Sequence, residues 1–165
     1  MCARGERTAY GGVMSHPDAD WAAVADRLAH DVAQLADGSS LEVAAVGSER
    51  PAKLPGLRRR LLGQQFVHIA PWVRLERVED HLVARCVSDH REIGFPLSPE
   101  EKVALSRLGW HAPGEADGPA LLRWVPDDVP TGPYLPAADV ARAVALGVGT
   151  LREVFSADPA RVRIA

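Results

Sequence analysis

A short helix with marked ends is the feature that most restricts how this chain can fold. Ser98 is a helix-capping residue, Pro99 follows at the first helical position, and Glu101 stands three residues after the cap. In this capping-box pattern the Ser and Glu side chains satisfy backbone N–H groups that the first helical turn leaves free. Gly109 then ends the helical pattern and Trp110 follows at once. The pattern predicts a helix that begins after Ser98 and ends at Gly109.

Segments typical of β-strands lie on both sides of this helix. They are Leu41 to Val46, Phe66 to Val73 and Leu82 to Val87 before it, and Leu121 to Val125 after it. Pro71 falls within the second segment and indicates an edge strand or a bulge, because proline cannot donate a hydrogen bond to the sheet. The first three segments are neighbours in the sequence, so we expect them to pair in an antiparallel meander. The stretch between the first two segments, residues 47–63, is expected to be a loop.

Two longer helices are expected near the ends of the chain. The first begins at Asp18 or Asp20, and its apolar residues recur at spacings of three and four, which predicts one buried stripe. The members of this stripe are Trp21, Val24, Leu28, Val32 and Leu35. The last helix opens at Pro136, and Gly147 within it is expected to allow close packing on the sheet or on a partner. Its apolar face comprises Val140, Val144, Val148, Leu151 and Phe155.

The order of these segments predicts the fold class. It runs helix, three strands, helix, strand, helix, which is typical of an α+β protein whose antiparallel sheet is flanked by helices. With 165 residues, one domain over residues 17–165 is expected. Residues 1–16 show no periodicity and are expected to form a flexible tail.

Charge, hydropathy and thiol content exclude several classes of protein. The formal net charge is −3, so no general attraction to nucleic acid is expected. No apolar run approaches the roughly 20 residues of a membrane span. The two cysteines, Cys2 and Cys86, make no disulfide framework, which favours a reducing, cytoplasmic location. The abundance of Ala, Arg and Val is similar to that of high-GC bacterial proteins.

No group of residues has the spacing of a catalytic or metal site. His81 and Cys86 are five residues apart on an expected strand, so they would point to opposite faces of the sheet. A zinc site would also need further ligands, and no Cys or His pair has that spacing. Ser88, Asp89 and His90 are adjacent in sequence, whereas the members of a hydrolase triad meet in space. We therefore predict a protein that is not an enzyme and uses no metal or cofactor.

A basic segment over residues 50–60 allows a second interpretation. Arg58, Arg59 and Arg60 follow Gly56 there, but the lysine and hydroxyl residue of a phosphate-binding loop are missing. Aromatic residues for base stacking are missing too, which argues against nucleic acid as the partner. The plain interpretation is a solvated charged loop. The functional alternative is a regulatory module that binds nucleic acid or an acidic ligand through these arginines.

Several short motifs in order resemble one bacterial family. They are Leu82 to Asp89, Leu97 to Glu101, Leu108-Gly109-Trp110 with Pro113, Leu122 to Trp124, and Thr150 to Phe155. Over residues 18–165 the chain resembles the type III secretion chaperone-like and YbjN-like peptide-binding chaperone (TY-Chap) domains. The resemblance implies a small α+β domain that presents a sheet face and helix grooves to a partner segment. It also implies frequent dimerisation and no active site. The chain departs from the family in two places. The basic segment over residues 50–60 is an insertion, and a single strand from Leu121 to Val125 stands where the family usually has a hairpin.

The four tryptophans are candidates for either the core or a binding site. Trp21, Trp110 and Trp124 are expected to pack in the core, since that is the commoner role of this residue. Trp72 follows Pro71, so we expect it to lie near an edge strand and to be partly exposed.

Two binding modes follow for a protein or peptide partner. A partner strand could add to a sheet edge, and the residues predicted to serve this mode are Trp72, Phe66 and Ile69. Alternatively, an apolar helix or a second copy of the chain could dock on the last helix. The residues predicted to serve that mode are Val148, Leu151 and Phe155.

Overall fold

The computed structural model describes residues 17–53, 66–90, 92–112, 114, 118–126 and 135–165. The predicted N-terminal tail and Arg58 to Arg60 lie outside the described residues. The elements follow in the order α1 (Pro17–Ala33), β1 (Ser40–Ala45), β2 (Arg50–Lys53), β3 (Phe66–Ile69), β4 (Trp72–Val78), β5 (His81–Cys86), α3 (Pro99–Arg107), β6 (Leu121–Val125) and α4 (Ala137–Gly149). A π-helical segment (Thr150–Val154), a 3₁₀ turn (Pro159–Arg161) and β7 (Val162–Ile164) complete the described chain.

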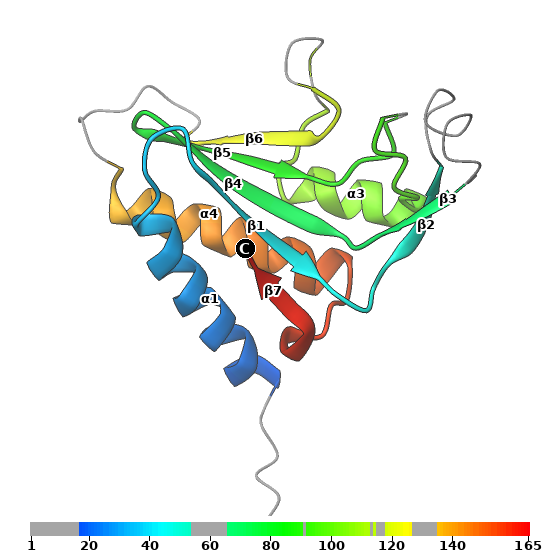
Figure 1. Ribbon diagram of the computed structural model, residues 1–165, viewed down its shortest axis with the longest axis horizontal. Coiled ribbons are helices and arrows are strands. Elements are labelled where there is room, and N and C mark those ends of the chain that lie inside the picture. Colours follow the sequence, from blue (N-terminus) through cyan, green and yellow to red (C-terminus); the bar gives the residue numbers. More distant parts are fainter. Residues whose placement is uncertain (1–16, 54–65, 91, 113, 115–117, 127–134) are drawn as a thin grey trace, which may run out of the picture.

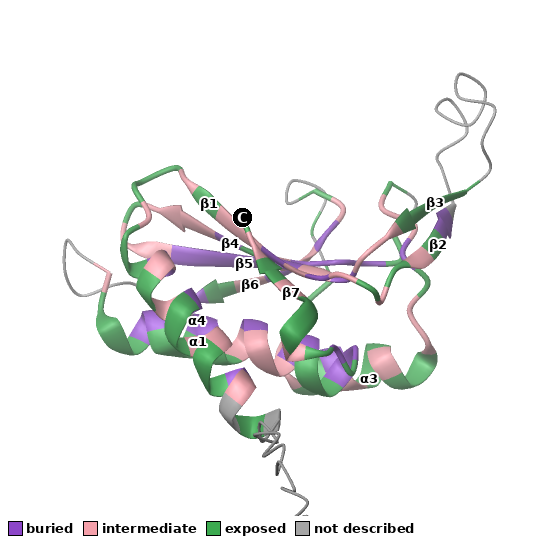
Figure 2. Ribbon diagram, turned by 60° about the horizontal axis from the view of Figure 1, so that its bottom comes forward, coloured by how far each residue is buried: buried purple, intermediate pink, exposed green. Residues whose placement is uncertain are grey.

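The described strands form two antiparallel sheets. The larger has the strand order β6-β5-β4-β1-β7, and the smaller pairs β2 with β3. The helices α1, α3 and α4 lie on one face of the larger sheet, and none of the described helices covers its other face (Figure 1, Figure 2). The α+β class and the antiparallel sheet predicted from sequence are confirmed.

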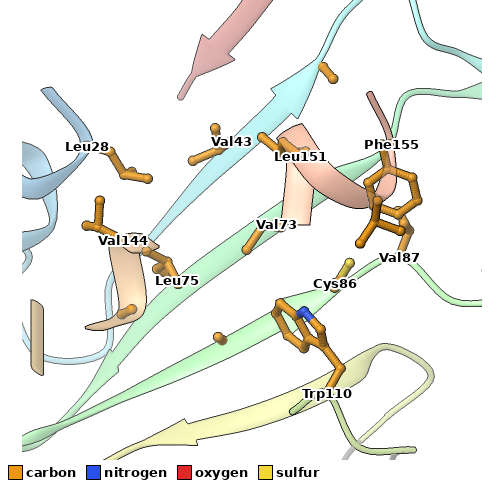
Figure 3. Packing of buried hydrophobic residues seen from close by; sticks show 14 of the residues in the cluster. Leu28, Val43, Val73, Leu75, Cys86, Val87, Trp110, Val144, Leu151 and Phe155 are labelled. Atoms are coloured by element: carbon orange, nitrogen blue, oxygen red, sulfur yellow. The ribbon is translucent and has the colours of Figure 1, made fainter. Parts of the chain in front are cut away.

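The core lies between the larger sheet and the helices (Figure 3). Leu28 of α1, Val73 and Leu75 of β4, and Leu151 after α4 are fully buried there. A Cβ atom on Gly147 would lie 3.6 Å from Val73 Cγ1 and 3.9 Å from a methyl group of Leu28. The backbone of α4 therefore runs close to both the sheet and α1, which confirms the close packing on the sheet predicted for this glycine.

The strands β1, β2, β3 and β4 form one long bent hairpin. The bend lies between the strand pairs Ala44–Trp72 and Arg50–Ile69. At the bend, residues 45–49, which connect β1 to β2, lie opposite residues 70–71, which connect β3 to β4. The pairing register consequently shifts by three residues across the bend. Gly47, in the longer connection between β1 and β2, takes a left-handed conformation with φ of 92°. The single strand predicted from Phe66 to Val73 is thus two strands separated at Pro71.

Two strands were missed by the sequence prediction. β2 lies in the predicted loop over residues 47–63, where a proline and charged residues hide the strand pattern, and β7 lies after the last predicted helix. The predicted edge position of Trp72 is also wrong, because β4 is the central strand of the larger sheet and the edges are β6 and β7. Trp72 is half-buried, so its predicted partial exposure is confirmed.

Candidate partner-binding surface

The sheet face opposite the described helices presents mixed charge at its centre. Glu42 Oε2 lies 2.7 Å from an Nη atom of Arg74, and Glu76 Oε2 lies 3.6 Å from Arg85 Nε. The Arg74 guanidinium also sits 5.5 Å from the ring centroid of Trp72. Such partly exposed ion pairs contribute at most about 1 kcal/mol each. The opposite charges at the centre of this face therefore balance in pairs.

Trp124 lies on the same face and is 43% exposed, so the core position predicted for it is wrong. Its neighbour Val125 belongs to the core, and successive strand residues point to opposite faces. The Trp124 ring meets His81 edge-to-face at a centroid distance of 5.7 Å. Val83, directly opposite Trp124 on β5, is 1% exposed. The core positions predicted for Trp21 and Trp110 are confirmed.

The β2–β3 pair, which we call the arm, projects from the main sheet (Figure 2). Phe66 is 48% exposed and Val67 is 37% exposed. Because adjacent strand residues point to opposite faces, each face of the arm shows an exposed apolar side chain at this end. In the described part of the chain, β2 and β3 pair only with each other. The arm therefore combines exposed apolar side chains with strand edges that have no strand partner among the described residues.

One arginine fastens the base of the arm to the main body. The two Nη atoms of Arg50 donate to the two carboxylate oxygens of Glu101, at 2.8 Å and 2.6 Å. Arg50 also donates to the Pro96 carbonyl at 3.1 Å, and its guanidinium lies 5.3 Å from the Phe95 ring centroid. The hydrogen bonds from Arg50 hold the pKa of Glu101 below its ordinary value. This first residue of the basic segment is thus an anchor for the arm.

Glu101 serves α3 at the same time. Its Oε2 accepts a hydrogen bond from the Ser98 backbone N–H at 2.8 Å, and the Ser98 Oγ accepts one from the Glu101 N–H at 3.2 Å. The capping box predicted from sequence is confirmed. What the sequence could not show is that the capping carboxylate also binds a residue 51 positions earlier.

The surface predicted on the last helix is not available. Leu151 is fully buried and Phe155 is 5% exposed, with its ring edge-to-face on Phe95 at 5.7 Å. Val148 is half-buried against the same core. The helix covers the sheet, so its apolar face packs on this chain and is turned away from a partner. We accordingly leave Leu151 and Phe155 out of the candidate surface.

The two edges of the larger sheet offer less backbone than the arm. On β6, Leu122 exchanges two 3.0 Å hydrogen bonds with His111, and Pro126, which has no N–H, follows the strand. On β7, the Val162 N–H donates to the Pro159 carbonyl. Each edge can therefore pair with only a short segment, since the bridge and the prolines interrupt the ladder.

A groove of about 550 Å³ lies between α1 and the first turns of α4. Small apolar residues from both helices line it, and His30 and Arg77 provide its titratable groups; the small residues are Ala29, Ala33, Ala137 and Ala141. Arg77 is held by the carbonyl groups of Leu35 and Glu79, at 2.9 Å and 3.0 Å. The groove corresponds to the helix-docking mode predicted from sequence, although none of the residues named for that mode lines it.

The candidate metal and thiol groups do not converge. Cys86 is fully buried, and burial raises the pKa of its thiol. Among the described residues, no three His, Cys, Asp or Glu side chains are placed to hold a metal ion. Within the same residues, no helix combines the length and apolar character needed to cross a bilayer.

Comparison with protein families gives a match over most of the chain. The model of the family TY-Chap3, described as T3SS (YopN, CesT) and YbjN peptide-binding chaperone 3, matches residues 14–163. No curated protein and no solved structure matches the chain.

Proposed function

Because this chain belongs to the TY-Chap3 family of peptide-binding chaperones, we propose that it binds an extended segment of a partner polypeptide along the β2–β3 arm. One observation carries the proposal. Phe66 and Val67 are both more than a third exposed, and they lie on β3, which pairs only with β2 in the described chain. Exposed apolar residues beside an unpaired strand edge favour addition of a partner strand.

Residues of the arm and residues of the adjoining strand β4 would contribute differently to partner binding. Phe66 supplies apolar surface at the end of the arm, and Trp72 supplies a half-buried aromatic ring where the arm meets the sheet. Ile69 packs partly against the core, so its contribution is to hold β3 in place. Backbone hydrogen bonds to the added strand would provide affinity, and these side chains would provide selectivity.

The proposal assigns binding to the protein and no chemical step. We propose that this binding takes place in the cytoplasm of a bacterium, because the free, buried Cys86 suits a reducing compartment. A homodimer is part of the same proposal, with the arm of a second copy as one occupant of a strand edge that has no strand partner among the described residues. Light scattering coupled to size exclusion tests it, and a monomer at high micromolar concentration would contradict it.

A peptide selection tests the arm directly. Twelve-residue peptides selected on the wild-type protein should bind Phe66→Ser at least tenfold more weakly. Val103→Ser is the matched control, because Val103 is 51% exposed and belongs to α3 and not to the arm. Backbone amides of β3 should also gain protection from hydrogen exchange when a peptide binds. Equal affinity for both variants, with no protection of β3, would overturn the proposal.

The alternative proposal is a regulatory module that binds a nucleic acid or an acidic ligand through Arg58, Arg59 and Arg60. Of the described residues in that segment, Arg50 is engaged with Glu101. Salt-sensitive binding of an oligonucleotide that disappears when the three arginines are changed to alanine would favour this alternative.

A further inference from the structure

The arm has two outer strand edges, and they differ in their hydrogen-bonding groups. The β2–β3 ladder comprises four consecutive residue pairs, and Pro51 lies within it, opposite His68. In an antiparallel ladder, pairs that exchange two hydrogen bonds alternate with pairs that exchange none. Pro51 has no N–H to donate, so Pro51 and His68 form a pair of the second kind. The backbone polar groups of both residues therefore point to the outer edges of the arm.

The outer edge of β3 carries a complete set of donors and acceptors. Phe66 and His68 are two residues apart on this strand, so both direct an N–H and a C=O group to its outer edge. The outer edge of β2 lacks a donor at Pro51. Among the described residues, no further strand pairs with either edge. A partner strand can therefore form an unbroken ladder only along β3.

β3 is also the more exposed strand of the arm (Figure 2). Its first three residues are all exposed. In β2, Ala52 is fully buried, and the Arg50 side chain is held by Glu101. These contacts of the arm with the body thus belong to β2, and β3 is the strand left for a partner.

The side chains of β3 alternate between the two faces of the arm. Phe66 and His68 lie on one face, and Val67 lies on the other face with Ala52, its neighbour across the ladder. Ile69 shares this second face and packs against the core. A strand added to β3 would also place its side chains alternately on both faces. The residue beside Phe66 and the residue beside Val67 would each meet an exposed apolar side chain.

We propose that the outer edge of β3 binds an extended polypeptide segment with two consecutive apolar residues, antiparallel to β3. This direction gives the more stable pairing. From its N-terminal end, the segment has a residue beside His68, an apolar residue beside Val67 and an apolar or aromatic residue beside Phe66. Cross-strand pairs of aromatic and β-branched side chains stabilise such a ladder. Proline is excluded at the first and third positions, because both donate an N–H to β3.

This inference rests on the arm binding proposed above, and it specifies the edge and the segment. The probe for its test is the tightest-binding twelve-residue peptide from the selection on the wild-type protein. His68→Pro removes an outward N–H from β3 and should weaken binding of this peptide at least tenfold. Lys53→Pro removes the corresponding N–H from β2, and binding should change less than twofold. His68→Ala should change it less than threefold, which separates loss of the N–H from loss of the imidazole.

Measurements with the wild-type protein make the test independent of how well these variants fold. When the peptide binds, the amide protons of Phe66 and His68 should gain at least tenfold protection from hydrogen exchange, and that of Lys53 should gain none. N-methylation of single peptide residues should weaken binding at least tenfold at two positions that are two residues apart. Serine in place of the apolar residue between them should weaken binding at least fivefold.

Several results would overturn the inference. Equal losses in His68→Pro and Lys53→Pro, or protection of Lys53 in place of the β3 amides, would remove the preference for the β3 edge. If Phe66→Ser still weakens binding in that case, binding along the arm stands and only the choice of edge fails. A selection that yields no peptide sensitive to Phe66→Ser would overturn both proposals. Protection of the β3 amides that rises with protein concentration in the absence of peptide would make a second copy the occupant of this edge.

Discussion

Arg50 and Glu101, which are 51 positions apart, form a two-point ion pair that joins the β2–β3 arm to the first turn of α3. The Glu101 side chain is only 12% exposed and the Arg50 side chain 34%. The same carboxylate completes the capping box of α3. A single side chain therefore sets both where the helix begins and how the arm meets the body.

Replacing this carboxylate should destabilise the protein. Glu101→Gln leaves a side chain that can still cap the helix but cannot form the charged pair with Arg50. Loss of hydrogen bonds to a charged group predicts a decrease of about 1–3 kcal/mol in the free energy of unfolding. Urea denaturation measures it. Glu42→Gln is the control, because its pair with Arg74 is more exposed and should contribute less than about 1 kcal/mol. Equal effects of both changes would contradict the anchoring role.

The same pair predicts a pH dependence. The pKa of Glu101 in the folded protein is lowered from a reference value of 4.5, first by its hydrogen bonds with Arg50. A carboxyl group with a lowered folded pKa stabilises the fold above its unfolded pKa, and this contribution is lost as pH falls through the folded value. The difference in unfolding free energy between wild type and Glu101→Gln should therefore be constant near neutrality and shrink below about pH 4.5. A difference that grows on acidification would refute this assignment.

Trp110 should depend on its hydrogen bond to the π-helical segment. The buried indole N–H donates to Thr150 Oγ1 at 2.9 Å. Thr150→Val keeps the shape and removes the acceptor, which leaves a buried donor unsatisfied at a cost of about 1–3 kcal/mol. Thr150→Ser retains the hydroxyl and should recover part of this loss. Chemical denaturation followed by tryptophan fluorescence reports both, and identical stabilities for the two variants would argue against the hydrogen bond.

Two properties of position 109 favour glycine, its backbone conformation and its closeness to Arg123, and a control variant can separate their contributions to stability. Its φ of 86° disfavours any residue with a Cβ atom, and that atom would collide with Arg123. Gly38 has a φ of 74°, and a Cβ atom added to it would have nothing within 4 Å, so Gly38→Ala measures the backbone cost alone, about 1 kcal/mol or more. Gly109→Ala should cost more in thermal unfolding only by the hydrogen bond from Arg123 to the Leu108 carbonyl, about 0.5–1.5 kcal/mol, because the guanidinium lies at the end of a flexible side chain and can move away.

Core and arm residues should respond differently to truncation. Leu151→Ala removes a fully buried side chain and should cost about 2–5 kcal/mol. Phe66→Ser alters a side chain that is 48% exposed and should change stability by less than about 0.5 kcal/mol. Urea midpoints test both. A small effect of Leu151→Ala would restore the last helix as a candidate surface.

Elements with a strong local pattern were predictable. The capping box at Ser98, the helix end at Gly109 and the stripe containing Leu28 each depend on residues within a few turns of one another. The fold class followed from the order of these elements, and the match to the family over residues 14–163 agrees with it. Trp124 was assigned to the core wrongly, since alternation along a strand reveals two faces without telling which one the helices cover.

The bent hairpin, the central place of β4 and the anchor at Glu101 were beyond local prediction. Each depends on which distant strand pairs with which and in what register, and those choices are made by the packing of the whole domain. The same holds for Leu151 and Phe155. Their spacing correctly defined an apolar helix face, but whether that face meets a partner or the chain's own sheet depends on how the completed fold covers it. Local sequence was sufficient for the helices, for most of the strands and for the family, and the long-range packing of the chain selected the surfaces that remain open to a partner.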